Sequence, residues 1–444
     1  MGKDNIEKYS ALYSLLKKIS GFWHDKIFYR KIIVVGRENI KPDCHLILAP
    51  NHQNALLDAL AVLFTMKGQP VFLARADIFK NKFIASLLYF LKILPVYRIR
   101  DGFSNLKAND EIFRKTIDVI RNKNGLVILP EGDHAGFRRL RQLKKGICRV
   151  AFQAEEAMDF NLNIKIIPVG LEYTNYSRFR QVLTVVYGKM IEVSDYHDLY
   201  RTNQEKALNE LRNRLAAEMK NVMVHIESEK DYEAIDELRN IINGRYSDDI
   251  KNPKLFRDRK LIARLNGIRE SNPNLYDKIC SLSLDVKKKS TRLQTSYRLL
   301  EKKNHPLGFL LAGILSLIIS LPLYVFGNIF TLTFLKIPEL QIRKIKDHQF
   351  HGSLKFGYSF GLALILLPVY LIIALLIIRP WWLALLISLM IPLAGIFAWN
   401  YIILIKRIIG GFRIRKYIKN KNRDFISLRK SYDELTGLIA QLEQ

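Results

Sequence analysis

Cysteine is scarce in this chain. Only three cysteines occur among 444 residues, at positions 44, 148 and 280, and no two of them form a CxxC pair. This scarcity excludes a disulfide framework and indicates a reducing compartment. No metal-ligand spacing surrounds Cys44 or Cys148, and we interpret both as buried filler.

Acidic residues are also in deficit. The chain has 42 aspartates and glutamates against 70 lysines and arginines, which gives a net charge of +28. Such an excess predicts an anionic partner, either nucleic acid or a membrane surface. Zinc-finger, RNA-recognition and helix-turn-helix signatures are all missing, whereas long uncharged tracts are present. We therefore predict a lipid bilayer as the partner, and no nucleic acid.

The first residues lack the pattern of a secretory signal. The apolar stretch 9–23 is interrupted by Lys17 and Lys18, and no small-residue cleavage site follows it. Its apolar residues recur at helical spacing, which predicts an interfacial amphipathic helix within residues 1–30. These residues are Leu12, Tyr13, Leu15, Leu16, Ile19, Phe22 and Trp23.

Three tracts have no charged residue at all: 307–335, 357–378 and 380–405. A helix crosses the hydrocarbon core in about 20 residues, so each tract is long enough. Clusters of lysine and arginine flank the first tract on both sides and follow the third. Only Arg379 separates the second tract from the third, beside two tryptophans.

Basic flanks stay on the cytoplasmic side, and three simple crossings cannot place all of them there. We therefore predict that the first tract is a hairpin or re-entrant segment, broken near Pro322 or at Gly327-Asn328. The other two tracts are predicted to form a helical hairpin that turns at Arg379-Pro380. Three plain crossings are the alternative.

The first candidate site motif is the sequence APNHQNALLD at 49–58. An apolar run at 45–50 predicts a buried strand before it, and 55–64 predicts a helix after it, so His52 lies where a strand passes into a helix. Asp58 can orient the imidazole if the intervening turn is not regular helix. A histidine held by an aspartate is the usual arrangement for removing a proton from a hydroxyl. The alternative is a capping asparagine beside a core histidine.

Three further strands end in polar residues. The run 126–130 leads into Glu131 and Gly132, the run 93–97 leads into Arg98 and Arg100, and a fourth apolar run, 166–173, surrounds a proline. Ligands bind at the carboxyl ends of strands in open α/β sheets, so we expect His52 and Glu131 at one edge. The alternatives are a plain β-turn and a solvated strand end.

Taken in order, these four blocks resemble the glycerolipid acyltransferase superfamily, which includes glycerol-3-phosphate and lysophosphatidic acid acyltransferases. The resemblance covers about 33–191. Five residues separate His52 from Asp58, as in a branch that resembles the fungal glycerol-3-phosphate/dihydroxyacetone-phosphate acyltransferases, whose members also carry later hydrophobic segments. Asp133-His134 stands where many members have Thr-Arg or Gly-Ser, so a usual arginine is missing, and the second block lacks its leading glycine.

The resemblance implies acyl transfer from a thioester of coenzyme A or acyl carrier protein to a hydroxyl of a phosphorylated glycerol, without a metal or other cofactor. It makes His52 the general base and Asp58 the residue that orients it. Glu131 would bind the acceptor hydroxyl, and Arg98 and Arg100 its phosphate. The remaining residues of the predicted substrate-binding set are Asn51, Gly132, Lys144 and Lys145.

The basic run 138–145 is predicted to open a helix-like segment. It either replaces the missing arginine or forms a basic surface that faces anionic lipid. Further on, residues 204–304 are charged and have apolar residues at helical spacing, which predicts a helical extension.

The predicted fold is an α/β acyltransferase domain with a central mixed sheet flanked by helices, followed by a helical region and a membrane-embedded helical tail. The predicted boundaries are 1–30, 31–203, 204–304, 305–405 and a basic cytoplasmic tail at 406–444. We expect a cell-membrane enzyme whose catalytic domain faces the cytoplasm. The alternatives are acylation of another lyso-lipid, such as a lyso-amino-acid lipid, and a non-catalytic lipid-binding protein on the same fold.

Overall fold

The computed structural model describes residues 5–41, 43–96, 106–244, 249–302 and 305–442. The chain divides into two compact units. The first comprises Met1–His225 together with Asp347–Ser353, and the second comprises Ile226–Lys346 and Leu354–Gln444. These two units were not predicted as such, and the predicted domain boundaries remain predictions. The first unit continues beyond the predicted boundary at 203, to His225, and also includes the distant segment Asp347–Ser353.

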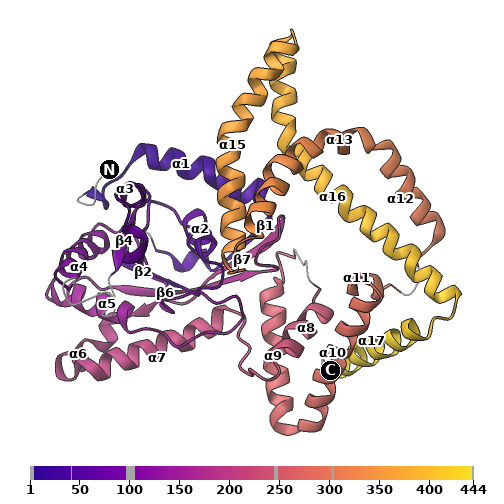
Figure 1. Ribbon diagram of the computed structural model, residues 1–444. Coiled ribbons are helices and arrows are strands. Elements are labelled where there is room, and N and C mark those ends of the chain that lie inside the picture. Colours follow the sequence, from indigo (N-terminus) through magenta and orange to yellow (C-terminus); the bar gives the residue numbers. More distant parts are fainter. Residues whose placement is uncertain (1–4, 42, 97–105, 245–248, 303–304, 443–444) are drawn as a thin grey trace. The chain divides into compact units, whose positions relative to one another are not determined.

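A mixed sheet forms the centre of the first unit, as predicted (Figure 1). Its order is β1-β7-β6-β2-β5-β3-β4, and β8 also pairs with β6. Strand β6 runs antiparallel to β7 and β8, whereas the other pairs are parallel. The strands are β1 (Tyr29–Val35), β2 (Leu46–Pro50), β3 (Val71–Arg75), β4 (Ile93–Val96), β5 (Leu126–Val127), β6 (Lys165–Tyr173), β7 (Gln181–Tyr187) and β8 (Ile191–Glu192).

Helices flank this sheet because its central strands are buried and apolar. Every residue of β2 is buried, which is typical of parallel strands covered on both faces. The core joins Ile47 and Ile166 of the sheet to Phe152 and Leu211 of two helices. The helices of this unit are α1 (Ala11–Phe22), α2 (Leu56–Thr65), α3 (Lys82–Phe90), α4 (Leu106–Arg121), α5 (Gly146–Glu156), α6 (His197–Thr202) and α7 (Gln204–Val222).

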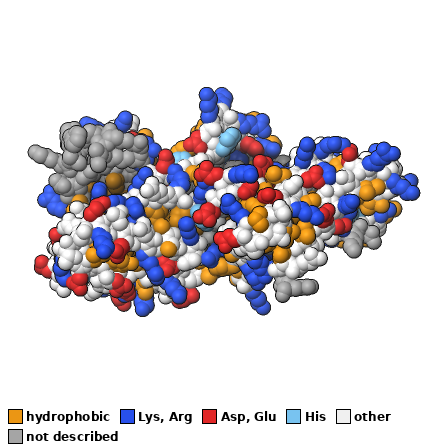
Figure 2. Space-filling model, turned by 90° about the horizontal axis from the view of Figure 1, so that it is seen from below, with side chains coloured by type: hydrophobic (Ala, Val, Ile, Leu, Met, Phe, Trp, Pro, Cys, Tyr) orange, Lys and Arg blue, Asp and Glu red, His pale blue; other side chains and the backbone are white. Residues whose placement is uncertain are grey.

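Charges of both signs are present on one face of the molecule. Figure 2 shows lysine and arginine side chains interspersed with aspartate and glutamate on the face that it presents. Such mixing is typical of a solvated face.

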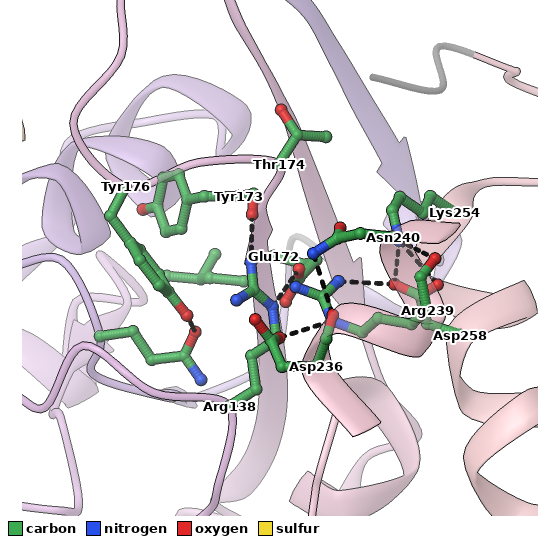
Figure 3. A network of polar contacts seen from close by, with 12 residues as sticks. Arg138, Glu172, Tyr173, Thr174, Tyr176, Asp236, Arg239, Asn240, Lys254 and Asp258 are labelled. Atoms are coloured by element: carbon green, nitrogen blue, oxygen red, sulfur yellow. Dashed lines mark hydrogen bonds and ion pairs between the residues drawn. The ribbon is translucent and has the colours of Figure 1, made fainter. Parts of the chain in front are cut away.

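The second unit is helical and has a buried ionic network near its start. Lys254 and Arg239 both lie 2.7 Å from the buried carboxylate of Asp258 (Figure 3). The helices of this unit are α8 (Tyr232–Ile242), α9 (Lys254–Ser271), α10 (Pro273–Arg292), α11 (Tyr297–Leu300), α12 (Leu307–Ile319), α13 (Leu321–Phe330), α14 (Ile337–Ile342), α16 (Trp381–Lys419) and α17 (Arg423–Gln441), with most of α15 (Phe350–Ile377).

In the described part of the chain, three helical stretches are long and apolar enough to cross a membrane: Leu321–Ile342, Phe350–Ile377 and Trp381–Lys419. The first tract is broken at Ser320, where α12 ends and α13 begins. Pro322 lies in the first turn of α13, where a missing N–H is tolerated. The tract therefore breaks beside Pro322, one of the two predicted places.

The other predicted break, Gly327-Asn328, lies inside α13. A Cβ on Gly327 would stand 2.1 Å from the carbonyl oxygen of Ala394 in α16, so this glycine serves close helix packing. Helix α15 ends at Ile377 and α16 begins at Trp381, so the chain turns at Arg379-Pro380, as expected.

Candidate active site

Hydrogen bonds at the end of β2 determine the position of the backbone that leads into His52. The backbone N–H of Asn51 donates to Val169 of β6 at 3.2 Å. Its buried side-chain amide accepts from the Leu171 N–H at 2.6 Å and donates to the Leu171 carbonyl at 3.2 Å. Asn51 thus extends the hydrogen bonding between the strands by one residue. Its predicted part in substrate binding stays a prediction, and in this structure its amide is occupied by the backbone of β6.

His52 and Asp58 form a pair. His52 Nδ1 lies 2.9 Å from Asp58 Oδ2; the imidazole is 16% exposed and the carboxylate is completely buried. The same oxygen accepts from the N–H groups of Gln53 and Asn54, both at 2.7 Å, and Oδ1 accepts from the Tyr173 hydroxyl at 2.8 Å. Four donors therefore fix the carboxylate. A proton on Nδ1 that is shared with Asp58 leaves Nε2 as the basic nitrogen.

Tyr173, at the end of β6, is a site residue that sequence reasoning missed. Burial, and then the charge of Asp58, raise the pKa of Tyr173 well above its usual value. The phenol therefore stays protonated and remains a donor. The one available signal was its position at the end of the fourth apolar run.

The five-residue spacer is accommodated by a strained turn. Ala55 has φ +46° and ψ −124°, in the left-handed half of the backbone map that alanine rarely adopts. Asp58 then falls in the first turn of α2, and its carboxylate reaches back to the N–H groups that precede the helix. The turn is thus not regular helix, which is the condition for Asp58 to reach His52.

Glu131 lies on the other side of the His52 backbone. Its Oε1 accepts from the His52 N–H at 2.8 Å, and its Oε2 accepts from the backbone and side chain of Arg141, both at 3.2 Å. The Ala135 N–H donates to the His52 carbonyl at 3.2 Å. Burial raises the pKa of Glu131, against the lowering effect of these hydrogen bonds. Both peptide groups of His52 are therefore held by this loop, and the predicted contact of Glu131 with an acceptor hydroxyl stays a prediction.

The prediction of a helix-like segment over the basic run 138–145 is wrong. Helix α5 begins only at Gly146. The N–H groups of Arg141 and Lys144 donate instead to Glu131 Oε2 and to the Pro130 carbonyl, at 3.2 and 2.8 Å. The run therefore follows the neighbouring loop, and only its last residue, Lys145, takes part in the hydrogen bonding of α5, through its carbonyl.

Two arginines of this run form hydrogen bonds with neighbouring residues. The buried Arg138 donates to Glu172 and to the Tyr173 carbonyl, each at 2.7 Å, and lies over the Tyr176 ring (Figure 3). Arg141 is 28% exposed, and its Nη2 has no hydrogen-bond partner among the described residues. Arg141 is thus the cation that the run brings to Glu131.

The other predicted binding residues differ in their surroundings. Lys144 is exposed, and Lys145 forms an ion pair with Glu205. Gly132 has φ +71°, which favours glycine in the turn after Glu131. Arg98 and Arg100 lie outside the described residues.

His134 is a second imidazole at this site. Its ring lies edge-on to that of His52, with the centroids 5.4 Å apart, and its Nε2 is 3.5 Å from Asp347 Oδ2. Within the described ranges, no group of three or more His, Cys, Asp or Glu side chains is arranged to hold a metal ion.

Comparison with known proteins supports the resemblance that the four blocks predicted. Residues 31–172 match the family model described as Acyltransferase. This match and the relatives below agree with the resemblance to the glycerolipid acyltransferase superfamily.

Two particular relatives come from Saccharomyces cerevisiae. Glycerol-3-phosphate O-acyltransferase 2 is 26% identical over 128 residues, which is 29% of this chain and 17% of the relative. Glycerol-3-phosphate O-acyltransferase 1 is 24% identical over 173 residues, or 37% and 22%. The match thus spans about a fifth of the length of either curated relative.

Among solved structures, the chain is similar to the 1-acyl-sn-glycerophosphate acyltransferase PlsC from Thermotoga maritima. The identity is 18% and the TM-score 0.33, over 47% of this chain and 80% of that one.

Proposed function

We propose that this chain transfers a fatty acyl group from an acyl thioester to a hydroxyl of a glycerol-phosphate-type acceptor. The observation that carries the proposal is the His52–Asp58 pair, in which a buried carboxylate with three further donors orients a partly exposed imidazole. The acyltransferase family match and the two yeast relatives support the choice of reaction.

The chemistry requires one base. His52 Nε2 takes the proton of the acceptor hydroxyl while the hydroxyl oxygen attacks the thioester carbonyl. The C–S bond then breaks, and the departing thiolate takes the proton from the imidazolium. A positioned base contributes on the order of 10²–10⁴-fold to such a step. The acceptor attacks directly, so no covalent acyl-enzyme and no metal are required.

The acceptor phosphate needs donors of opposite charge, and a guanidinium can bind it in a two-pronged manner. Arg141 is the described candidate, because its side chain is partly exposed and its buried Nη2 has no hydrogen-bond partner among the described residues. Arg98 and Arg100 remain predicted phosphate ligands, and either coenzyme A or acyl carrier protein would carry the acyl group.

We place the reaction at the cytoplasmic face of the cell membrane. Helix α1 exposes Leu12, Leu15, Ile19 and Phe22, which share one face at helical spacing and suit the lipid interface. The three helices of membrane length and the basic flanks support the same location.

The test is acyl transfer by the purified full chain, with radiolabelled acyl-coenzyme A and acyl carrier protein as donors. The acceptors are glycerol-3-phosphate, dihydroxyacetone phosphate, lysophosphatidic acid and a lyso-amino-acid lipid. Transfer to a phosphorylated glycerol supports the proposal. A preference for the lyso-amino-acid lipid would mean that the acceptor is this lipid and not a phosphorylated glycerol. No transfer to any acceptor from either donor would indicate a non-catalytic lipid-binding protein.

A further inference from the structure

A segment far along the chain completes the turn that carries Asp58. Residues Asp347–Ser353 belong to the first unit, although 121 residues separate them from its other part at His225. Ser353 is the fourth residue of α15 and is 5% exposed. Its hydroxyl donates to the Asn54 carbonyl at 3.1 Å and accepts from the Leu57 N–H at 3.3 Å.

These two contacts bracket the strained residue. Ala55 lies between Asn54 and Leu57, and the Leu57 N–H also donates to the Asn54 carbonyl at 3.0 Å. The Asn54 N–H in turn donates to Asp58. A strained backbone persists only where its surroundings over-determine it. The two hydrogen bonds of Ser353 are restraints of this kind.

The segment approaches closely because Gly352 has no side chain. A Cβ at this position would lie 2.4 Å from the Tyr176 carbonyl oxygen and 2.9 Å from the Asn54 side-chain oxygen. Nearby, the Phe350 ring packs edge-on against His134, with the centroids 4.6 Å apart. The first turn of α15 is therefore fitted to the loops on both sides of His52.

We propose that Ser353 is a positioning residue for the His52–Asp58 pair, holding the Asn54–Leu57 turn in the strained form that directs Asp58 to His52. The first turn of a helix of membrane-spanning length thereby becomes part of the catalytic site. This inference rests on the proposed acyltransferase function.

The test compares three variants of the full chain: Ser353→Ala, Ser353→Ala with Ala55→Gly, and Ser388→Ala as the matched control. The Ser388 hydroxyl is also buried in a helix but donates to the Ala384 carbonyl, away from this turn. A hydrogen bond contributes roughly 0.5–1.5 kcal/mol, so we expect kcat of Ser353→Ala to fall about 2- to 12-fold with the KM of both substrates within about twofold.

The double variant separates positioning from mere packing. Glycine adopts the conformation of Ala55 without strain, so Ala55→Gly should restore most of the lost kcat. An unchanged kcat in Ser353→Ala, or a loss that Ala55→Gly does not repair, overturns the inference while leaving the proposed function standing.

Hydrogen–deuterium exchange of residues 51–58 supplies a readout that does not depend on activity. Ser353→Ala should accelerate exchange there, and Ser388→Ala should not. Equal exchange in Ser353→Ala and the unmodified chain overturns the inference even if no acyl transfer is ever detected.

Discussion

At the scale of single residues, the proposed mechanism makes His52 and Asp58 unequal. His52→Ala removes the base and should lower kcat by at least about 10²-fold. Asp58→Asn keeps an oxygen for the turn but loses the charge that stabilises the imidazolium, so kcat should fall clearly, yet by less. Steady-state acyl transfer measures both, with the melting temperature of His52→Ala as the control for folding. Near-normal turnover in folded His52→Ala protein contradicts the mechanism.

Tyr173 offers a second test, because its hydroxyl donates to Asp58 in a fully buried position. Tyr173→Phe should destabilise the protein by about 1.5–3 kcal/mol, as expected for a hydrogen bond to a charged group, and should also lower kcat.

The matched control is Tyr297→Phe. The Tyr297 hydroxyl also donates to a buried carboxylate, that of Glu237, at 2.7 Å. Its loss should reduce stability and leave kcat unchanged. Equal kcat in the two variants would remove Tyr173 from the site.

The raised pKa of Glu131 predicts that the stability of the folded chain depends on pH. Burial raises its pKa, so the folded chain holds a proton at pH values where the unfolded chain has released it. Its contribution to stability should therefore fall as the pH rises from the usual glutamate range through the raised pKa. Glu131→Gln should lack this part of the slope, which urea unfolding at a series of pH values measures. A slope that is identical in both proteins would contradict the raised pKa.

The sequence predicts that His52, Asp58 and Glu131 lie together, but it does not predict which side chains support them. His52 and Glu131 follow apolar runs, and strand ends meet at one edge of the sheet, while Asp58 lies only six residues after His52. The hydroxyl of Tyr173 reaches Asp58 only through the register of β6. The run 138–145 lies in a loop without periodicity. No sequence pattern therefore predicts that Arg141, and not Arg138, contacts Glu131.

At the scale of elements, the pair α13–α16 depends on glycine. Gly327→Ala should push the two helices apart, because its Cβ would meet a backbone oxygen at 2.1 Å. We expect a lower melting temperature in detergent. The control is Gly357→Ala in α15, where a Cβ meets nothing within 4 Å. Equal melting temperatures for the two variants would contradict the close packing.

Apolar runs predicted the buried strands and the membrane tracts because burial demands an uncharged sequence. They could not predict the basic run correctly, since its backbone hydrogen bonds go to a neighbouring loop. Nor could they predict where the first tract breaks, because both a proline and a glycine can interrupt a helix, and only the packing partner of Gly327 distinguishes them.

At the scale of the whole molecule, the charge pattern predicts a topology. Trp381 and Trp382 should lie at the interface opposite to the basic flanks. Pro380→Cys should react with an impermeant maleimide added outside the cytoplasm, whereas Lys344→Cys and Lys416→Cys should not, with the unmodified chain as the blank. Labelling of Lys416→Cys from outside would establish an odd number of crossings.

The first unit is discontinuous in sequence, and this affects when it can be completed during synthesis of the chain. A ribosome releases the chain from its N-terminus, so the tract 307–335 emerges before Ser353 does. If Ser353 restrains the catalytic turn, every newly made molecule has a lower kcat until synthesis has passed this tract. Chains that terminate before residue 353 would then bind membranes through α1 but acylate more slowly. The order of translation would thus keep an incomplete enzyme below full activity.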